Sequence, residues 1–182
     1  ALDSPKADIG FQLTFFRSRP GTAEGLQSPL AARQILFAHA ALTVPGDRLR
    51  HGERAARAGL GAGFSEFDCD VHIGAWRIAR EDRGKGEIFR LRMQNSQFSY
   101  DFTLTPSQPL LLQGDGGYSR KGHGPELASY YLSWPQLQVD GVLVLDGKRQ
   151  TASGRAWFDH EWSTAILGAA AVGWDWIGIN LD

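Results

Sequence analysis

The stretch DIGFQLTFFRSR (residues 8–19) alternates between apolar and more polar side chains along most of its length. Successive side chains of a β-strand point to opposite faces, so a strand with one buried face has an apolar residue at every second position. The stretch therefore predicts a half-buried strand. Its apolar side carries Ile9, Phe11, Leu13 and Phe15.

Most of the remaining sequence has the same period of two. Short alternating runs are separated by residues rich in Gly, Pro, Asp and Ser, which are typical of hairpin connections. This spacing favours an antiparallel sandwich or barrel. The further strands that we expect are residues 34–43, 70–79, 87–93, 98–105, 128–134, 141–146, 151–158 and 173–181.

The stretch GDRLRHGERAARAGLG (residues 46–61) departs from this alternation. It is rich in Arg, Ala and Leu, it has a plausible N-cap at Asp47, and Gly59 or Gly61 offers an end. These signals predict one short helix that lies across the outside or one mouth of the β structure.

The stretch LLLQGDGGYSRKGHGPE (residues 110–126) is the long irregular segment of the chain. Its five glycines give backbone freedom, and Tyr118, Arg120, Lys121 and His123 give it polar surface. Two interpretations stay open: a mobile lid at the rim of a pocket, or a long hairpin turn.

The composition is that of a globular domain with a sizeable core. Hydrophobic residues make up 42% of the 182 residues and charged residues 21%, and the formal net charge is −1. No basic stripe predicts nucleic-acid binding, and no apolar run is long enough for a transmembrane helix. A single cysteine excludes an intrachain disulfide. We expect no cofactor and no metal, because no dinucleotide fingerprint and no local pair with metal-ligand spacing is present.

The stretch GRAWFDHEWS (residues 154–163) places three acid–base side chains between two tryptophans. If it is extended, Trp157, Asp159 and Glu161 share one face, and Phe158, His160 and Trp162 share the other. The second face is apolar apart from the histidine, so His160 is the candidate inward-pointing acid–base group. Asp159 and Glu161 would orient neighbours or form pairs. The alternative is that all three side chains only hold a strand in place.

Other aromatic residues lie in nearby strand candidates. Residues 173–182 (GWDWIGINLD) contain Trp174 and Trp176, and residues 128–134 (ASYYLSW) contain Tyr130 and Tyr131. Aromatic faces bind elongated apolar ligands and stabilise cations, although aromatic residues in strands also build cores. The candidate ligand-binding residues are Trp157, Phe158, Trp162, Trp174, Trp176, Tyr130 and Tyr131.

Five segments in this order resemble the AttH-like group of the carotenoid 1,2-hydratase superfamily: GFQLTFFRSR, LLLQGDGGYSRKG, ASYYLSWPQL, GRAWFDHEWS and GWDWIGINLD. The resemblance implies an all-β, antiparallel lipocalin-like (calycin) barrel, with two barrels in the full-length protein. Residues 1–172 would form the first barrel, and residues 173–182 a strand that leads towards the second. The abrupt ends of the sequence agree with a piece of a longer polypeptide.

The residues and the resemblance together leave three functional hypotheses open. The first is a periplasmic or secreted carrier that binds an apolar small molecule (a lipid, polyene or isoprenoid) and has transporter components as partners. The second is a cofactor-independent hydratase, isomerase or cyclase, in which His160, Asp159 and Glu161 manage protons on a carotenoid-like alkene. The third is a structural domain with no ligand. No nucleophile-elbow pattern supports a hydrolase.

Overall fold

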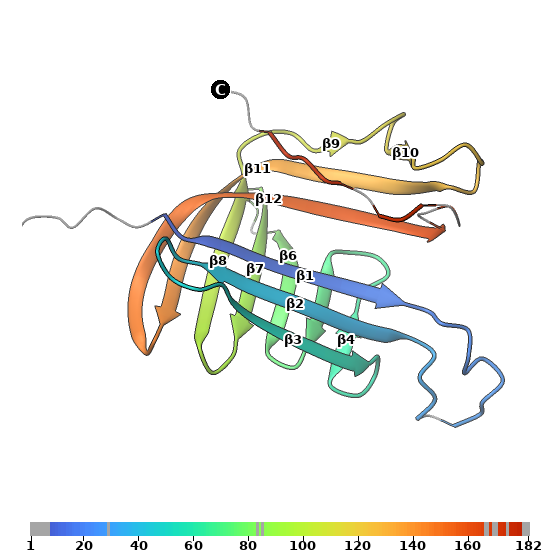
Figure 1. The fold of residues 1–182 in the computed structure, drawn as a ribbon, viewed down its shortest axis with the longest axis horizontal. Coiled ribbons are helices and arrows are strands. Elements are labelled where there is room, and N and C mark those ends of the chain that lie inside the picture. The colour runs from blue at the N-terminus through green and yellow to red at the C-terminus, as the bar shows by residue number, and fades with distance from the viewer. Residues whose placement is uncertain are drawn as a thin grey trace, which may run out of the picture. The chain divides into compact units, whose positions relative to one another are not determined.

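A computed structural model describes residues 8–28, 30–82, 84, 86–165, 168, 171–173 and 175–179. All regular secondary structure in these residues is β (Figure 1). The strands are β1 (Gly10–Ser18), β2 (Ile35–Thr43), β3 (Arg50–Arg57), β4 (Ala62–Phe64), β5 (Asp70–Ile73), β6 (Trp76–Asp82), β7 (Glu87–Gln94), β8 (Phe98–Pro106), β9 (Leu111–Leu112), β10 (Tyr118–Arg120), β11 (Ala128–Leu145) and β12 (Lys148–Ala165).

The chain divides into two compact units. The first comprises residues 1–103 and 141–152, and the second comprises residues 104–140 and 153–182. The long strands β11 and β12 contribute residues to both. Each unit is therefore discontinuous in the sequence.

The first unit contains two antiparallel sheets. One is β1-β2-β3, whose strands run side by side in Figure 1, with Gly10 opposite Thr43 and Leu42 opposite Arg50. The other has the order β11-β8-β7-β6-β5-β4. The antiparallel all-β prediction is confirmed.

The core of the first unit lies between these two sheets. Tyr100 of β8 donates a hydrogen bond from its hydroxyl to the Gln12 carbonyl of β1 at 3.0 Å, and Phe11 packs edge-on against Phe102 at 5.1 Å between ring centroids. Fully buried side chains fill the space around them. The core between the two sheets is therefore filled with close-packed aromatic and aliphatic side chains. The largest buried side chains in this unit are Trp76, Phe89, Leu36, Leu42 and Met93.

The predicted helix over residues 46–61 is wrong, because this segment contains β3, which pairs with β2 along its length. Gly52 explains why this segment forms a strand and not a helix. A Cβ at this position would lie 2.9 Å from the Asn95 amide nitrogen and 3.4 Å from the Trp76 ring. Close packing of an extended chain on Trp76, with Arg54 stacked over the same ring at 4.9 Å, therefore overrides a local preference for helix.

Other predicted boundaries also differ from the structure. The run 70–79 is broken into β5 and β6 by a turn at Gly74, whose φ is 57°. The runs 128–134 and 141–146 are parts of one strand, β11. The described residues of 173–181 lie outside the strands, since a strand exists only where its backbone finds a pairing partner.

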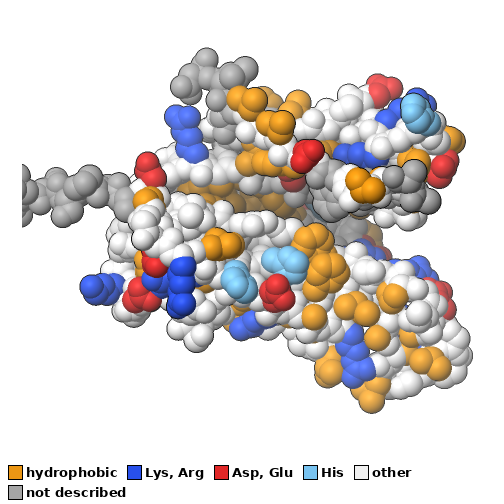
Figure 2. Space-filling model, viewed as in Figure 1, with side chains coloured by type: hydrophobic (Ala, Val, Ile, Leu, Met, Phe, Trp, Pro, Cys, Tyr) orange, Lys and Arg blue, Asp and Glu red, His pale blue; other side chains and the backbone are white. Residues whose placement is uncertain are grey.

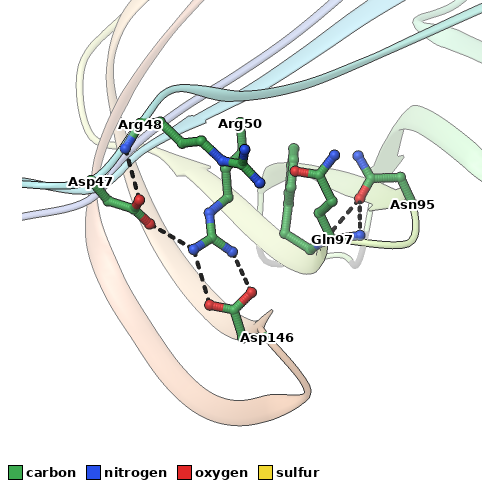
Figure 3. Close-up of polar contacts among 7 residues, drawn as sticks. Asp47, Arg48, Arg50, Asn95, Gln97 and Asp146 are labelled. Atoms are coloured by element: carbon green, nitrogen blue, oxygen red, sulfur yellow. Dashed lines mark hydrogen bonds and ion pairs between the residues drawn. The ribbon is translucent and has the colours of Figure 1, made fainter.

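The tip of the β11–β12 hairpin is held by an arginine from β3 (Figure 3). Asp146 and Gly147 both have positive φ (50° and 75°), as a tight two-residue hairpin turn requires. The Arg50 guanidinium donates to the Asp146 carboxylate at 2.5 and 2.9 Å and to Asp47 at 2.6 Å. All three residues belong to the first unit, so this cluster ties one of its sheets to the other.

The outer face of the β1-β2-β3 sheet carries a small aromatic cluster. Phe16 stacks on Phe37 at 4.6 Å, and His39 lies 5.4 Å from the Phe16 ring. Figure 2 shows hydrophobic and histidine side chains close together over these strands. No helix long and apolar enough to cross a membrane occurs in the described part of the chain.

Candidate functional site

The second unit brings β11 and β12 together at the acidic stretch that the sequence singles out. Alternation along β12 separates its side chains into two faces, as predicted. One face carries Trp157 and two carboxylates that meet buried serines of β11, and the other carries Phe158, His160 and Trp162. The two faces have different chemistry.

Asp159 is the best-anchored carboxylate on the polar face. It accepts hydrogen bonds from the Ser133 hydroxyl and from the Trp157 indole N–H, each at 2.6 Å. Ser133 is fully buried and also accepts a hydrogen bond from the Gln113 amide at 2.9 Å. Hydrogen bonds to a charged acceptor are short and strong, so they fix the orientation of the Asp159 side chain.

Glu161, two residues further along β12, is anchored in the same way. It accepts a hydrogen bond from the hydroxyl of Ser129, which is buried, and forms an ion pair with the Lys121 ammonium at 2.8 Å. The Lys121 nitrogen also lies 4.7 Å from the centre of the Tyr131 ring. The lysine therefore compensates the charge of Glu161 and makes a cation–π contact with the face of the Tyr131 ring.

Three aromatic side chains adjoin these carboxylates. The Trp176 indole N–H donates to the Tyr131 hydroxyl at 3.1 Å, and Trp157 and Trp176 pack edge to face at 5.9 Å. Burial raises the pKa of Tyr131, and the neighbouring Asp159 and Glu161 carboxylates act in the same direction. Tyr131 therefore remains a neutral hydrogen-bond donor at physiological pH.

His160 does not point into an apolar interior. It lies on the other face of β12, where it is exposed and its ring centre is 5.1 Å from that of Trp162. Contact with Trp162 removes part of the water around the ring, and this partial desolvation lowers the pKa of His160, so the imidazole is mostly neutral at pH 7. The expected orientation fails because the carboxylates on the opposite face turn towards the buried serines.

The remaining aromatic residues on this second face have different surroundings. Phe158 is half-buried and stacks at 5.2 Å on Trp134, which belongs to the core of the second unit. Tyr130 stacks on Trp162 at 5.6 Å, and both are about half exposed. The predicted residue Trp174 lies outside the described residues.

Sequence reasoning missed the partners of the two carboxylates. Ser129, Tyr131 and Ser133 occupy alternate positions of one strand, so their shared face could have been inferred from the period of two. Lys121 lies in the glycine-rich stretch, and no periodic signal places it. Within the described ranges, no group of three His, Cys, Asp or Glu side chains is arranged to hold a metal ion.

Comparison with known proteins identifies the family. The family model for AttH-like proteins matches residues 2–182. The chain belongs to the AttH-like family. The AttH-like chain resembles a crystal structure described as an AttH protein of Nitrosomonas europaea, with a TM-score of 0.78 and 40% identity. That match covers 90% of this chain and 48% of the other.

A second solved structure is kievitone hydratase of Nectria haematococca. Its TM-score is 0.58 with 14% identity, and the match covers 88% of this AttH-like chain and 49% of the hydratase. At this identity the likeness shows the fold alone. This AttH-like chain thus has the lipocalin-like antiparallel fold that the family resemblance implied, and it spans about half the length of both structures.

A curated relative is the 59 kDa isoform of the mitochondrial NAD-dependent malic enzyme of Solanum tuberosum. It is 28% identical over 92 residues, which is 45% of this AttH-like chain and 15% of that enzyme. The match covers a minor part of both proteins, so the function of that enzyme is not transferred here.

Proposed function

We propose that the protein binds an apolar small molecule (a lipid, polyene or isoprenoid) and acts as a carrier. The observation that carries the proposal is the aromatic group Tyr131, Trp157 and Trp176 beside two anchored carboxylates. Trp176 is 55% exposed, so its ring is available to a ligand. Following the family resemblance, we also propose that the whole protein works in the periplasm or is secreted, with transporter components as partners.

The arrangement suits a ligand with an apolar body and one polar end. Indole and phenol rings offer large apolar surfaces and π faces to a chain of conjugated double bonds. The Tyr131 hydroxyl and the carboxylates of Asp159 and Glu161 offer a donor and acceptors to a hydroxyl group. Their orientations are set by hydrogen bonds from Trp176, Trp157, Ser133 and Ser129 before any ligand arrives.

Acid catalysis on an alkene is the second candidate, because two carboxylates lie beside aromatic rings. In a hydration, a carboxylic acid would give its proton to one alkene carbon, and water would bond to the cationic neighbour. A proton of that water would then return to the carboxylate, so the acid is regenerated. The aromatic faces would stabilise the intermediate cation.

Binding of all-trans-retinol, a neutral polyene alcohol, tests the carrier proposal. We expect the ligand to quench tryptophan fluorescence with a stoichiometry of one per chain. Loss of an aromatic contact is worth about 1.4 kcal/mol, so Trp176→Ala should weaken binding about tenfold. The matched control is Phe67→Ala, which removes a ring that is 97% exposed elsewhere in the chain.

The retinol recovered by organic extraction separates the two candidates. Retinol that returns unchanged supports the carrier, and a product heavier by one water supports the hydratase. If the product is hydrated, Asp159→Asn or Glu161→Gln should slow turnover, and full turnover in both variants would remove their catalytic assignment. Equal retinol binding by the wild type and Trp176→Ala, or no binding at all, would contradict the proposed site and favour a structural role.

A further inference from the structure

A groove of about 930 Å³ lies in the first unit, on the face of β5–β8 that points away from the core. Its side chains alternate with buried ones along each strand. On β7, Arg90 and Arg92 alternate with the buried residues Phe89, Leu91 and Met93. The groove is therefore the outer face of the sheet, and it is separate from the aromatic and acidic site of the second unit.

Arginines dominate this groove. Four of them (Arg77, Arg90, Arg92 and Arg149) line it, against the two carboxylates Asp70 and Asp101. Since the whole chain has a formal charge of −1, this excess of positive charge is local. A concave basic surface on a nearly neutral chain attracts anions.

The two carboxylates do not satisfy all the arginines. Arg77 donates two hydrogen bonds to the Asp70 carboxylate, at 2.7 and 2.8 Å. The Asp101 carboxylate accepts one hydrogen bond from Arg90 at 2.6 Å and one from Arg92 at 3.1 Å. Arg92 donates through Nε, and its Nη groups have no hydrogen-bond partner among the described residues. The exposed Arg149 likewise has no ion pair to a described residue. Guanidinium donors therefore remain for an anion.

The register of β6 and β7 adds a second observation. Arg77 lies directly opposite Arg92 across the two strands. Like charges at directly opposite positions destabilise a sheet, so this pair costs stability unless negative charge lies beside it. Asp70 and Asp101 supply part of that charge, each bound to one member of the pair. A bound oxyanion would supply the rest.

One edge of the groove is apolar. Val142 and Val144 of β11 line it, together with Ala75. The volume is within the range of small-molecule sites, which is about 300–1,000 Å³. The combination fits a molecule with an oxyanion at one end and a short apolar body at the other.

We propose that this groove binds a small amphiphilic anion, a carboxylate or phosphate monoester, through Arg92 and Arg149, with its apolar part against Val142 and Val144. Arginine suits this ligand because its planar fork matches the oxygens of carboxylates and phosphates. The site is independent of the proposed carrier function, since it uses other residues in the other unit.

Isothermal titration calorimetry of the protein with octyl phosphate, octanoate and octanol tests the proposal. We expect one of the anions, or both, to bind once per chain, and the affinity to fall with added salt. Arg92→Gln and Arg149→Gln should each weaken anion binding by about tenfold or more, because each removes charge-assisted hydrogen bonds. Any binding of octanol should be the same in all variants. The matched control, Arg48→Gln, changes an exposed arginine outside the groove and should bind like the wild type.

Comparison of the titrations with octyl phosphate and with octanoate decides which oxyanion the groove prefers. Arg149 makes no hydrogen bond or ion pair to a described residue, so Arg149→Gln tests binding even if Arg92→Gln unfolds the chain. Absence of anion binding to the wild type would overturn the proposal. Equal affinity in the wild type and Arg149→Gln, or an equal loss in Arg48→Gln, would overturn it as well. Retinol binding through Trp176 is a separate result and does not depend on these outcomes.

Discussion

At the scale of single residues, the surroundings of a side chain decide its reactivity more than its type does. Cys69 is an example. It stands between Asp68 and Asp70, and burial, followed by the charges of these two aspartates, raises its pKa to about 12. The nucleophile of a cysteine is its thiolate, so this shift suppresses its chemistry at neutral pH.

We predict that Cys69 reacts slowly with thiol reagents in the folded protein. A free cysteine has a pKa of about 8.5, so the thiolate fraction at pH 8 should fall about a hundredfold or more on folding. The rate of reaction with 5,5′-dithiobis(2-nitrobenzoic acid) measures this effect, and the denatured chain is the control. Equal rates for the folded and denatured chain would contradict the pKa shift.

At the scale of elements, close backbone approach sets the composition of β11. At Gly141 this strand lies against β8 within the first unit. A Cβ on Gly141 would lie 2.1 Å from the Asp101 carbonyl oxygen and 3.0 Å from the Phe102 Cα. Both atoms belong to the backbone and cannot move aside as a flexible side chain does.

We therefore predict that Gly141→Ala destabilises the protein by about 1–3 kcal/mol, the usual cost of overpacking. Gly154→Ala is the matched control, because no atom lies within 4 Å of a Cβ at that position of β12. Alanine there should leave stability unchanged or raise it slightly. Urea denaturation of both variants checks the difference, and similar midpoints for the two would show that β11 can move away from β8.

At the scale of the whole molecule, the stability of the first unit is linked to pH through the Arg50 cluster. The Arg50 guanidinium holds the pKa values of Asp47 and Asp146 below the ordinary value of 3.8. A carboxyl group whose pKa is lowered by folding stabilises the folded state above its unfolded pKa. That stabilisation is lost as the pH falls through the lowered pKa. A second property of the whole molecule, that this chain forms the first of two barrels, stays a prediction.

We predict that acid weakens the wild type more than Asp146→Asn. Asparagine also tolerates positive φ, so the turn is kept while the charge is removed. Thermal unfolding should show Asp146→Asn less stable at pH 7, with the difference shrinking below about pH 4 as the wild-type carboxylates are protonated. Asp140→Asn, at an exposed position of β11, is the control. A constant difference between the wild type and Asp146→Asn at every pH would contradict the role of the Arg50–Asp146 pair.

The sequence by itself determined the β class, most strand positions, the family and the two faces of β12. These follow from alternation and from ordered motifs, which are local properties of the chain. Only the tertiary structure decided that residues 50–57 form a strand, because Gly52 packs on Trp76. Only the structure likewise decided that Asp159 and Glu161, and not His160, turn towards buried partners. The reason is physical: a period assigns side chains to faces, but burial depends on what the rest of the chain brings against each face.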